Sequence, residues 1–231
     1  MTTSTSSQCT TSSQCTTSSQ CTTAARITRS LLGYGVLAGP LYVGVSLAQA
    51  FTRDGFDLSK HAWSLLANGD HGWIQIVNFI VTGLATIAAA VGLRRVLDRR
   101  LAPALIAAYG ASLVGAGIFR ADPAQGFPLG TPETATISWH GILHLVVGGA
   151  GFVCLIVACF VLAKHFTRER RRGLAWFSRV TGVAFLAGFA GIASGSHGPT
   201  TLAFVAAVVL VWAWLATVCV HYYRALADAA A

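Results

Sequence analysis

Six apolar stretches of about 20 residues, separated by short polar segments, dominate the chain. They are residues 31–51, 73–93, 101–119, 141–163, 174–194 and 202–223. An α-helix of about 20 residues crosses a hydrocarbon core of about 30 Å. Helices are favoured because backbone amides in lipid have to be satisfied within their own segment. The pattern predicts an all-α polytopic membrane protein in which residues 29–225 form a bundle of six transmembrane helices.

The connections between these stretches alternate in their content of basic residues. Of the 16 Lys and Arg residues, all but Arg53, Lys60 and Arg120 lie on the side of the predicted bundle that carries both termini. The positive-inside rule therefore predicts that the N- and C-termini are cytoplasmic. The net charge of +8 then reflects membrane topology. The bilayer is the expected partner, and nucleic acid is not, because no soluble domain remains to bind it.

The segment before the first stretch is an internal repeat of Thr, Ser, Gln and Cys. The unit Thr-Thr-Ser-Ser-Gln-Cys ends at Cys9, Cys15 and Cys21. We expect residues 1–28 to form a disordered cytoplasmic tail, because this composition cannot build a core. The six-residue spacing fits no common zinc pattern. Two interpretations stay open: palmitoylation near the membrane, and a repeat expansion or upstream start codon without function.

Small residues recur at four-residue spacing in several stretches. Gly35 and Gly39 form one such step, and Gly191 and Gly195 form another. Further glycines in the third and fourth stretches are Gly110, Gly115, Gly117, Gly141 and Gly148. Glycines let helix backbones approach closely inside a membrane. Packing within one chain is the favoured interpretation, and a homodimer through these glycine-rich faces is the alternative.

Polar residues follow helical spacing in the first two stretches. The sets are Tyr42, Ser46, Gln49 and Arg53, and then His71, Gln75, Asn78 and Thr82. Each set lies on one side of its helix. Because polar side chains are unfavourable in lipid, both stripes should turn inward. The purely structural alternative is that these residues form interhelical hydrogen bonds, each worth roughly 0.6–2 kcal/mol.

Five of the seven histidines fall on the extracytoplasmic side of the predicted bundle. They are His61, His71, His140, His144 and His197. His140 and His144 are one helical turn apart, and Asp122 lies in the connection before them. Together with Ser46, Gln49, Gln75 and Asn78, these residues predict a polar His/Asp site in the outer half of the membrane.

Two histidines at positions i and i+4 of a helix can bind one metal ion. His140 and His144 have this spacing, but Gly141 stands where the metalloprotease signature has its glutamate. A catalytic zinc normally needs a third protein ligand, and no spacing rule selects it here. A b-type haem between His71 and His144 is a second hypothesis. Hydrogen bonding of His144 to the polar stripes is favoured over both.

Several segments carry a resemblance to a known family. Residues 55–66 and 69–79 are one part, and residues 119–123, 126–130 and 138–144 are the other. Over residues 31–223 the chain resembles a bacterial family of six-span membrane proteins, domain-of-unknown-function family 998. The family pattern includes the aspartate and the second histidine, which correspond to Asp122 and His144. The resemblance implies a six-span protein of a bacterial plasma membrane and supplies no activity.

Three classes of function remain open. A non-enzymatic membrane component, with a sensor, lipid-binding or assembly role, is favoured because nothing completes a catalytic set. A metal-dependent membrane enzyme acting on a lipid or envelope substrate is the alternative, with metal at His140 and His144. A small-molecule carrier or b-type haem protein is weaker, since the chain has no convincing inverted repeat and no charged residue near mid-membrane.

Overall fold

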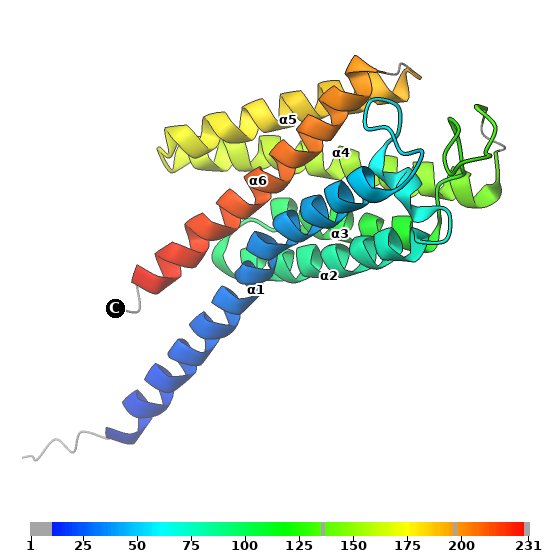
Figure 1. Cartoon of the computed structure of the whole chain (residues 1–231). Helices are drawn as coiled ribbons and strands as arrows, with labels where there is room; N and C mark the ends of the chain where they lie inside the picture. Colours follow the sequence, from blue (N-terminus) through cyan, green and yellow to red (C-terminus); the bar gives the residue numbers. More distant parts are fainter. Residues whose placement is uncertain (1–10, 135–136, 196–197, 229–231) are drawn as a thin grey trace, which may run out of the picture.

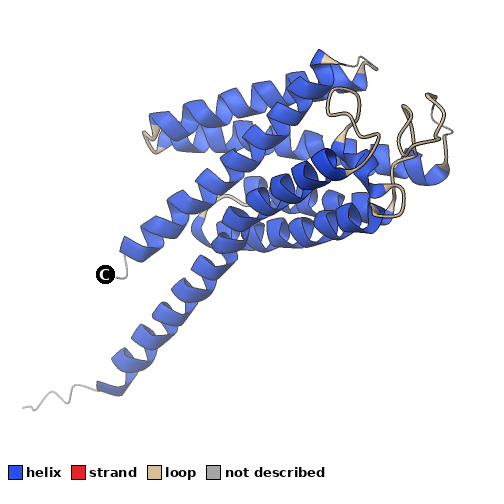
Figure 2. Cartoon of the chain, viewed as in Figure 1, coloured by secondary structure: helices blue, strands red, loops and turns tan. Residues whose placement is uncertain are grey.

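The computed structural model describes residues 11–134, 137–195 and 198–228, with the backbone alone for residues 11–22. These residues form the α-helices α1 (Thr11–Thr52), α2 (Gly72–Val96), α3 (Leu101–Ile118), α4 (Trp139–Arg168), α5 (Arg172–Ala193) and α6 (Pro199–Asp228). A short 3-10 helix, η1 (Trp63–Ala67), precedes α2. The described part of the chain has no strand (Figure 2). All six α-helices are long and apolar enough to span a membrane, as the sequence predicts.

The six helices form a closed ring. Each helix packs against the next one in the chain, and α1 packs against α6 (Figure 1). The connections from α2 to α3 and from α4 to α5 are only a few residues long. Short connections place neighbouring helices antiparallel. The cap, which we define as residues 53–71 and the described residues of 119–138, therefore lies at one end of the bundle, opposite both termini.

Aromatic side chains fill the interior of the ring. Trp212 of α6 contacts Tyr42 of α1, with ring centroids 5.1 Å apart, and Tyr109 of α3 at 5.9 Å. Phe152 of α4 continues the contacts to Phe185 of α5 at 5.3 Å in an edge-on arrangement. Tilted and edge-on pairs are favourable aromatic geometries. These rings connect five of the six helices across the interior.

Glycines let the helix backbones meet. A Cβ atom placed on Gly83 of α2 would lie 2.6 Å from the carbonyl oxygen of Gly110 on α3. A Cβ atom on Gly35 of α1 would lie 2.5 Å from Cys219 Sγ of α6 and 2.7 Å from Ala89 Cβ of α2. No larger residue fits these positions without a shift of the helices. The predicted close packing of Gly35 and Gly110 thus occurs within one chain.

Other glycines of the predicted faces do not mark a close approach of two helices. A Cβ atom on Gly148 or Gly195 would meet no heavy atom within 4 Å, and one on Gly191 would make only ordinary contact with Thr200. A homodimer through such faces stays a prediction.

Helix α1 extends beyond its apolar stretch. It begins at Thr11 and contains the candidate span Thr23–Thr52. The backbone of residues 11–28 is therefore helical where the sequence predicts a disordered tail. For residues 1–10, which lie outside the described residues, the disorder stays a prediction. Helices α4 and α6 likewise continue about one turn past their apolar stretches.

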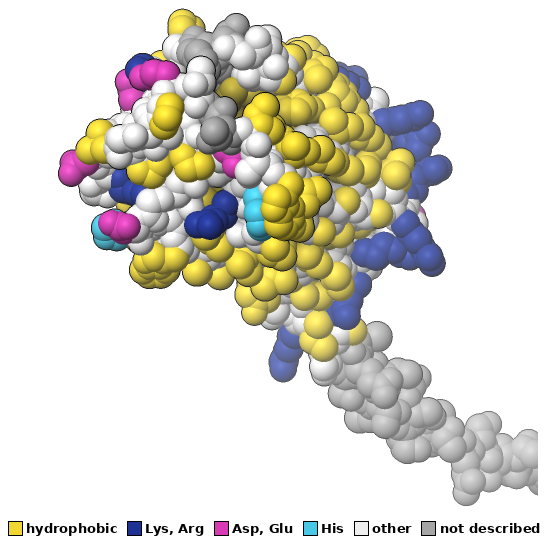
Figure 3. Space-filling view, turned by 90° about the vertical axis from the view of Figure 1, so that its right-hand side faces the viewer, with side chains coloured by type: hydrophobic (Ala, Val, Ile, Leu, Met, Phe, Trp, Pro, Cys, Tyr) yellow, Lys and Arg dark blue, Asp and Glu magenta, His cyan; other side chains and the backbone are white. Residues whose placement is uncertain are grey.

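The outside of the bundle is hydrophobic. Large apolar side chains are exposed on every helix, among them Leu37, Leu84, Ile118, Leu145, Val183 and Leu202. In Figure 3 a hydrophobic surface separates most of the visible Lys and Arg side chains from the cap. An apolar surface of this extent is typical of a protein that faces lipid. We call the end opposite the cap, which carries Arg95, Arg99, Lys164 and Arg168, the basic end.

Candidate functional site

The two predicted polar stripes meet in a buried hydrogen-bond network between α1 and α2, near the cap. Gln49 Nε2 donates to Gln75 Oε1 at 2.8 Å, and Gln75 Nε2 donates to Ser46 Oγ at 3.2 Å. Asn78 Nδ2 donates to the carbonyl oxygen of Tyr42 at 3.2 Å. Ser46 and Gln75 are fully buried. The inward orientation expected for Ser46, Gln49, Gln75 and Asn78 is therefore observed.

The network leaves two acceptors unused. Gln49 Oε1 and Asn78 Oδ1 are buried and accept no hydrogen bond from the described residues. Such atoms are usually satisfied by water or by a bound donor. The network can therefore receive a hydrogen-bond donor. Its hydroxyl, Ser46 Oγ, bonds the amide groups of Gln75 and Asn78 and no histidine or carboxylate of the described residues.

His61 connects the two segments of the cap. Its Nδ1 accepts a hydrogen bond from the backbone N–H of Asp57 at 2.8 Å. The neutral ring then carries its proton on Nε2, which donates to the carbonyl oxygen of Gln125 at 2.9 Å. The ring is buried and packs against both Phe56 and Phe127, with centroids 5.1 and 5.5 Å away. Both nitrogens are thus used by the backbone, which leaves none for a metal.

Two charged groups of the first cap segment have shifted pKa values. The Arg53 guanidinium donates to the carbonyl oxygens of Leu66 and Asn68, and partial burial lowers its pKa while Asp70 opposes that shift. Hydrogen bonds from Ser59 lower the pKa of the Asp57 carboxyl group. Arg53 therefore anchors the segment around η1 and does not continue the polar stripe of α1.

Asp122 holds the beginning of α4. Its carboxylate accepts from the backbone N–H of Ser138 at 2.8 Å and from the Ser138 hydroxyl. Ser138 Oγ in turn accepts from the N–H of Gly141 at 3.1 Å, as the N-cap residue of the helix. A negative charge beside a helix N-terminus is stabilising. Gly141, which stands where a metalloprotease has its glutamate, is in direct contact with this carboxylate.

His144 closes the end of α3. The buried ring donates from Nδ1 to the carbonyl oxygen of Phe119 at 2.8 Å. Phe119 is the C-cap residue of α3, where carbonyl groups lack partners within the helix. The prediction that His144 bonds the polar stripes is wrong, because the ring bonds the end of α3 instead.

The other predicted site histidines lie apart from this network. His140 is exposed and contacts Trp139 in a tilted arrangement, with ring centroids 3.6 Å apart. His71 is exposed at the start of α2 and makes no capping hydrogen bond. His197 lies outside the described residues. In the described ranges no group of three or more His, Cys, Asp or Glu side chains is placed to hold a metal. Zinc at His140 and His144, and haem between His71 and His144, stay predictions.

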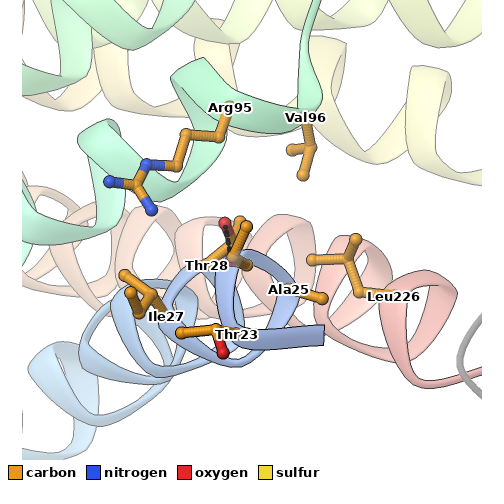
Figure 4. A pocket seen from close by; sticks show the side chains of 8 residues that line it. Thr23, Ala25, Ile27, Thr28, Arg95, Val96 and Leu226 are labelled. Atoms are coloured by element: carbon orange, nitrogen blue, oxygen red, sulfur yellow. Dashed lines mark hydrogen bonds between the residues drawn. The ribbon is translucent and has the colours of Figure 1, made fainter. Parts of the chain in front are cut away.

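Two grooves at the basic end were not anticipated from the sequence. The first, of about 770 Å³, lies between α1 and the ends of α2 and α6. Figure 4 shows Arg95 beside Thr28, whose hydroxyl donates to the carbonyl oxygen of Ala24 at 2.8 Å. The second, of about 810 Å³, lies between α4 and α5. Its only sequence signal is the pair Lys164 and Arg168, which are one helical turn apart.

The fold and its surface define a multi-pass helical membrane protein. The model of the family described as "Protein of unknown function (DUF998)" matches residues 36–221, and the chain belongs to this family. The match includes the cap, the α1–α2 network and the groove between α4 and α5. Neither the curated proteins nor the solved structures give a match to the chain.

Proposed function

We propose that the protein is a non-enzymatic component of the bacterial plasma membrane with an assembly role, in which the cap is a fixed recognition surface. The observation that carries this proposal is that Asp122, His61 and His144 all make structural hydrogen bonds. Asp122 and His144 bind backbone groups at the ends of α4 and α3, and His61 binds backbone groups of both cap segments. A catalytic acid, base or nucleophile has to face a substrate instead.

The proposed orientation places both termini in the cytoplasm and the cap outside. The concentration of Lys and Arg at the basic end supports it, since basic residues are retained on the cytoplasmic side. The cap would then meet extracytoplasmic partners. Two large apolar side chains of its second segment, Leu129 and Ile137, are 70% and 81% exposed and are available for such contacts.

Site-specific photo-crosslinking in intact cells tests the assembly role. A photoreactive residue at Leu129 or Ile137 should give a discrete crosslinked protein, whereas the same residue at Leu84, exposed on α2, should give lipid adducts alone. Crosslinks at Leu84 equal to those at the cap, or no protein crosslink at the cap, would contradict the proposal.

Elemental analysis tests the non-enzymatic part against the metal-enzyme alternative. The purified, detergent-solubilised protein should contain no stoichiometric zinc or iron. About one metal ion per chain, lost in the His140→Ala/His144→Ala variant, would establish the alternative and make Asp122 the next residue to substitute.

A further inference from the structure

The groove between α4 and α5 carries three cationic side chains at the basic end. Lys164 and Arg168 come from α4, and Arg179 comes from α5. Arg179 donates to Thr167 Oγ1 at 2.8 Å, and the Thr167 hydroxyl donates to the carbonyl oxygen of Ala163 at 2.7 Å. A neutral hydroxyl thus fixes the Arg179 guanidinium on the groove wall without neutralising its charge, and its other N–H donors remain for a ligand.

No acidic residue compensates these cations in the described part of the chain. The side chains of Lys164 and Arg168 make no hydrogen bond or ion pair there. The nearest acid in sequence, Glu169, pairs with His165 at 3.1 Å, and His165 also bonds the Tyr222 hydroxyl of α6 at 2.9 Å. Glu169 is therefore engaged at the α4–α6 side, and the groove stays positive.

Deeper in the bundle the same groove becomes apolar. Phe160 is one turn before Lys164 in α4, and Val183 is one turn after Arg179 in α5. Because the two helices are antiparallel, both steps lead away from the basic end. Phe160 and Val183 are 39% and 57% exposed, and Trp176 stands at the mouth of the groove. Tryptophan is enriched at the membrane–water interface.

We propose that this groove binds one anionic phospholipid, with the phosphate between Lys164, Arg168 and Arg179 and an acyl chain along Phe160 and Val183. The groove is positive at the interface and apolar deeper in the membrane. An anionic phospholipid is complementary to it, because its phosphate is negative and its acyl chains are apolar. A soluble anion would leave the apolar part empty, and a neutral lipid would leave the cations unpaired. The proposal is independent of the role of the cap.

Native mass spectrometry of the full chain in detergent tests this site, with phosphatidylglycerol and phosphatidylcholine of identical acyl chains as probes. The wild type should retain one phosphatidylglycerol in preference to phosphatidylcholine. Lys164→Gln/Arg168→Gln should reduce that retention by about tenfold or more, since each cation near an anionic lipid contributes about fivefold. Both side chains are exposed, so the variant should fold.

A matched control removes two other exposed charges from the same end. Arg99→Gln/Arg100→Gln should change phosphatidylglycerol retention by less than about twofold. A loss equal to that of the Lys164/Arg168 variant would show diffuse attraction to the basic end and overturn the site. Retention without preference for phosphatidylglycerol, or displacement of the lipid by inorganic phosphate, would overturn it as well.

A second pair of variants tests the apolar half without changing any charge. Val183→Trp should fill the acyl position and also reduce phosphatidylglycerol retention. Val209→Trp, at an exposed position of α6, is its control and should retain the lipid. Equal retention by both variants would contradict an acyl chain in the groove.

Discussion

The carboxylate of Asp122 occupies the space that a side chain at Gly141 would need. A Cβ atom on Gly141 would overlap Oδ1 and Oδ2 of Asp122. The same carboxylate binds Ser138, the N-cap residue of α4. The absence of a side chain at Gly141 therefore allows a cap residue 19 positions earlier in the chain to reach the first turn of a membrane helix.

Gly141→Ala should destabilise the protein by displacing Asp122. We expect a loss of about 1–3 kcal/mol in the free energy of unfolding, the usual cost of overpacking a filled site. Thermal unfolding in detergent and titration with SDS would measure it. Gly148→Ala, in the same helix with no heavy atom within 4 Å of the new Cβ, is the control and should be neutral or stabilising. Equal effects of the two substitutions would refute the steric role of Asp122.

The hydrogen bond between Gln49 and Gln75 should couple α1 to α2. In a double-mutant cycle with Gln49→Leu and Gln75→Leu, we expect a coupling energy of about 0.6–2 kcal/mol, as for other interhelical hydrogen bonds in membranes. The double variant should thus lose less than the sum of the single losses. SDS titration of the four proteins would measure this term, and strictly additive losses would show that the two amides act independently.

The helices and the α1–α2 network followed from periodicity. Ser46 and Gln75 are polar residues within apolar stretches, and lipid excludes their side chains from the outer surface. Each was therefore expected to face the interior of the bundle, and helices consecutive in the chain are usually neighbours. Helix type, span positions and the inward orientation of both stripes were accessible from these constraints alone.

The cap contacts were not accessible in the same way. His144 and Asp122 were visible as candidate residues, but His144 binds the backbone of Phe119, and Asp122 binds the backbone of Ser138 as well as its hydroxyl. Every residue offers such groups, so side-chain chemistry does not select among them. The groove between α4 and α5 was not predicted for a related reason. Arg179 and Lys164 line the same groove only because of the way α5 is rotated against α4.

His61 should determine how firmly the two cap segments hold together. His61→Phe keeps an aromatic ring against Phe56 and Phe127 but removes the hydrogen bonds to Asp57 and Gln125. We expect faster proteolytic cleavage within residues 119–138 of the detergent-solubilised protein, because local opening becomes less costly. His71→Phe, at an exposed position without a capping hydrogen bond, is the control. Unchanged cleavage in His61→Phe would contradict the bridging role.

The orientation of the bundle can be tested with single cysteines in a background where the six native cysteines are replaced by alanine. Lys60→Cys lies in the cap, and Asp98→Cys lies at the basic end between α2 and α3. A membrane-impermeant maleimide should label position 60 in intact cells, and position 98 only after lysis, because basic connections stay in the cytoplasm. Arg170→Cys, between α4 and α5, should behave like position 98. Labelling of positions 98 and 170 from outside, with position 60 protected, would reverse the topology and place the cap against cytoplasmic partners.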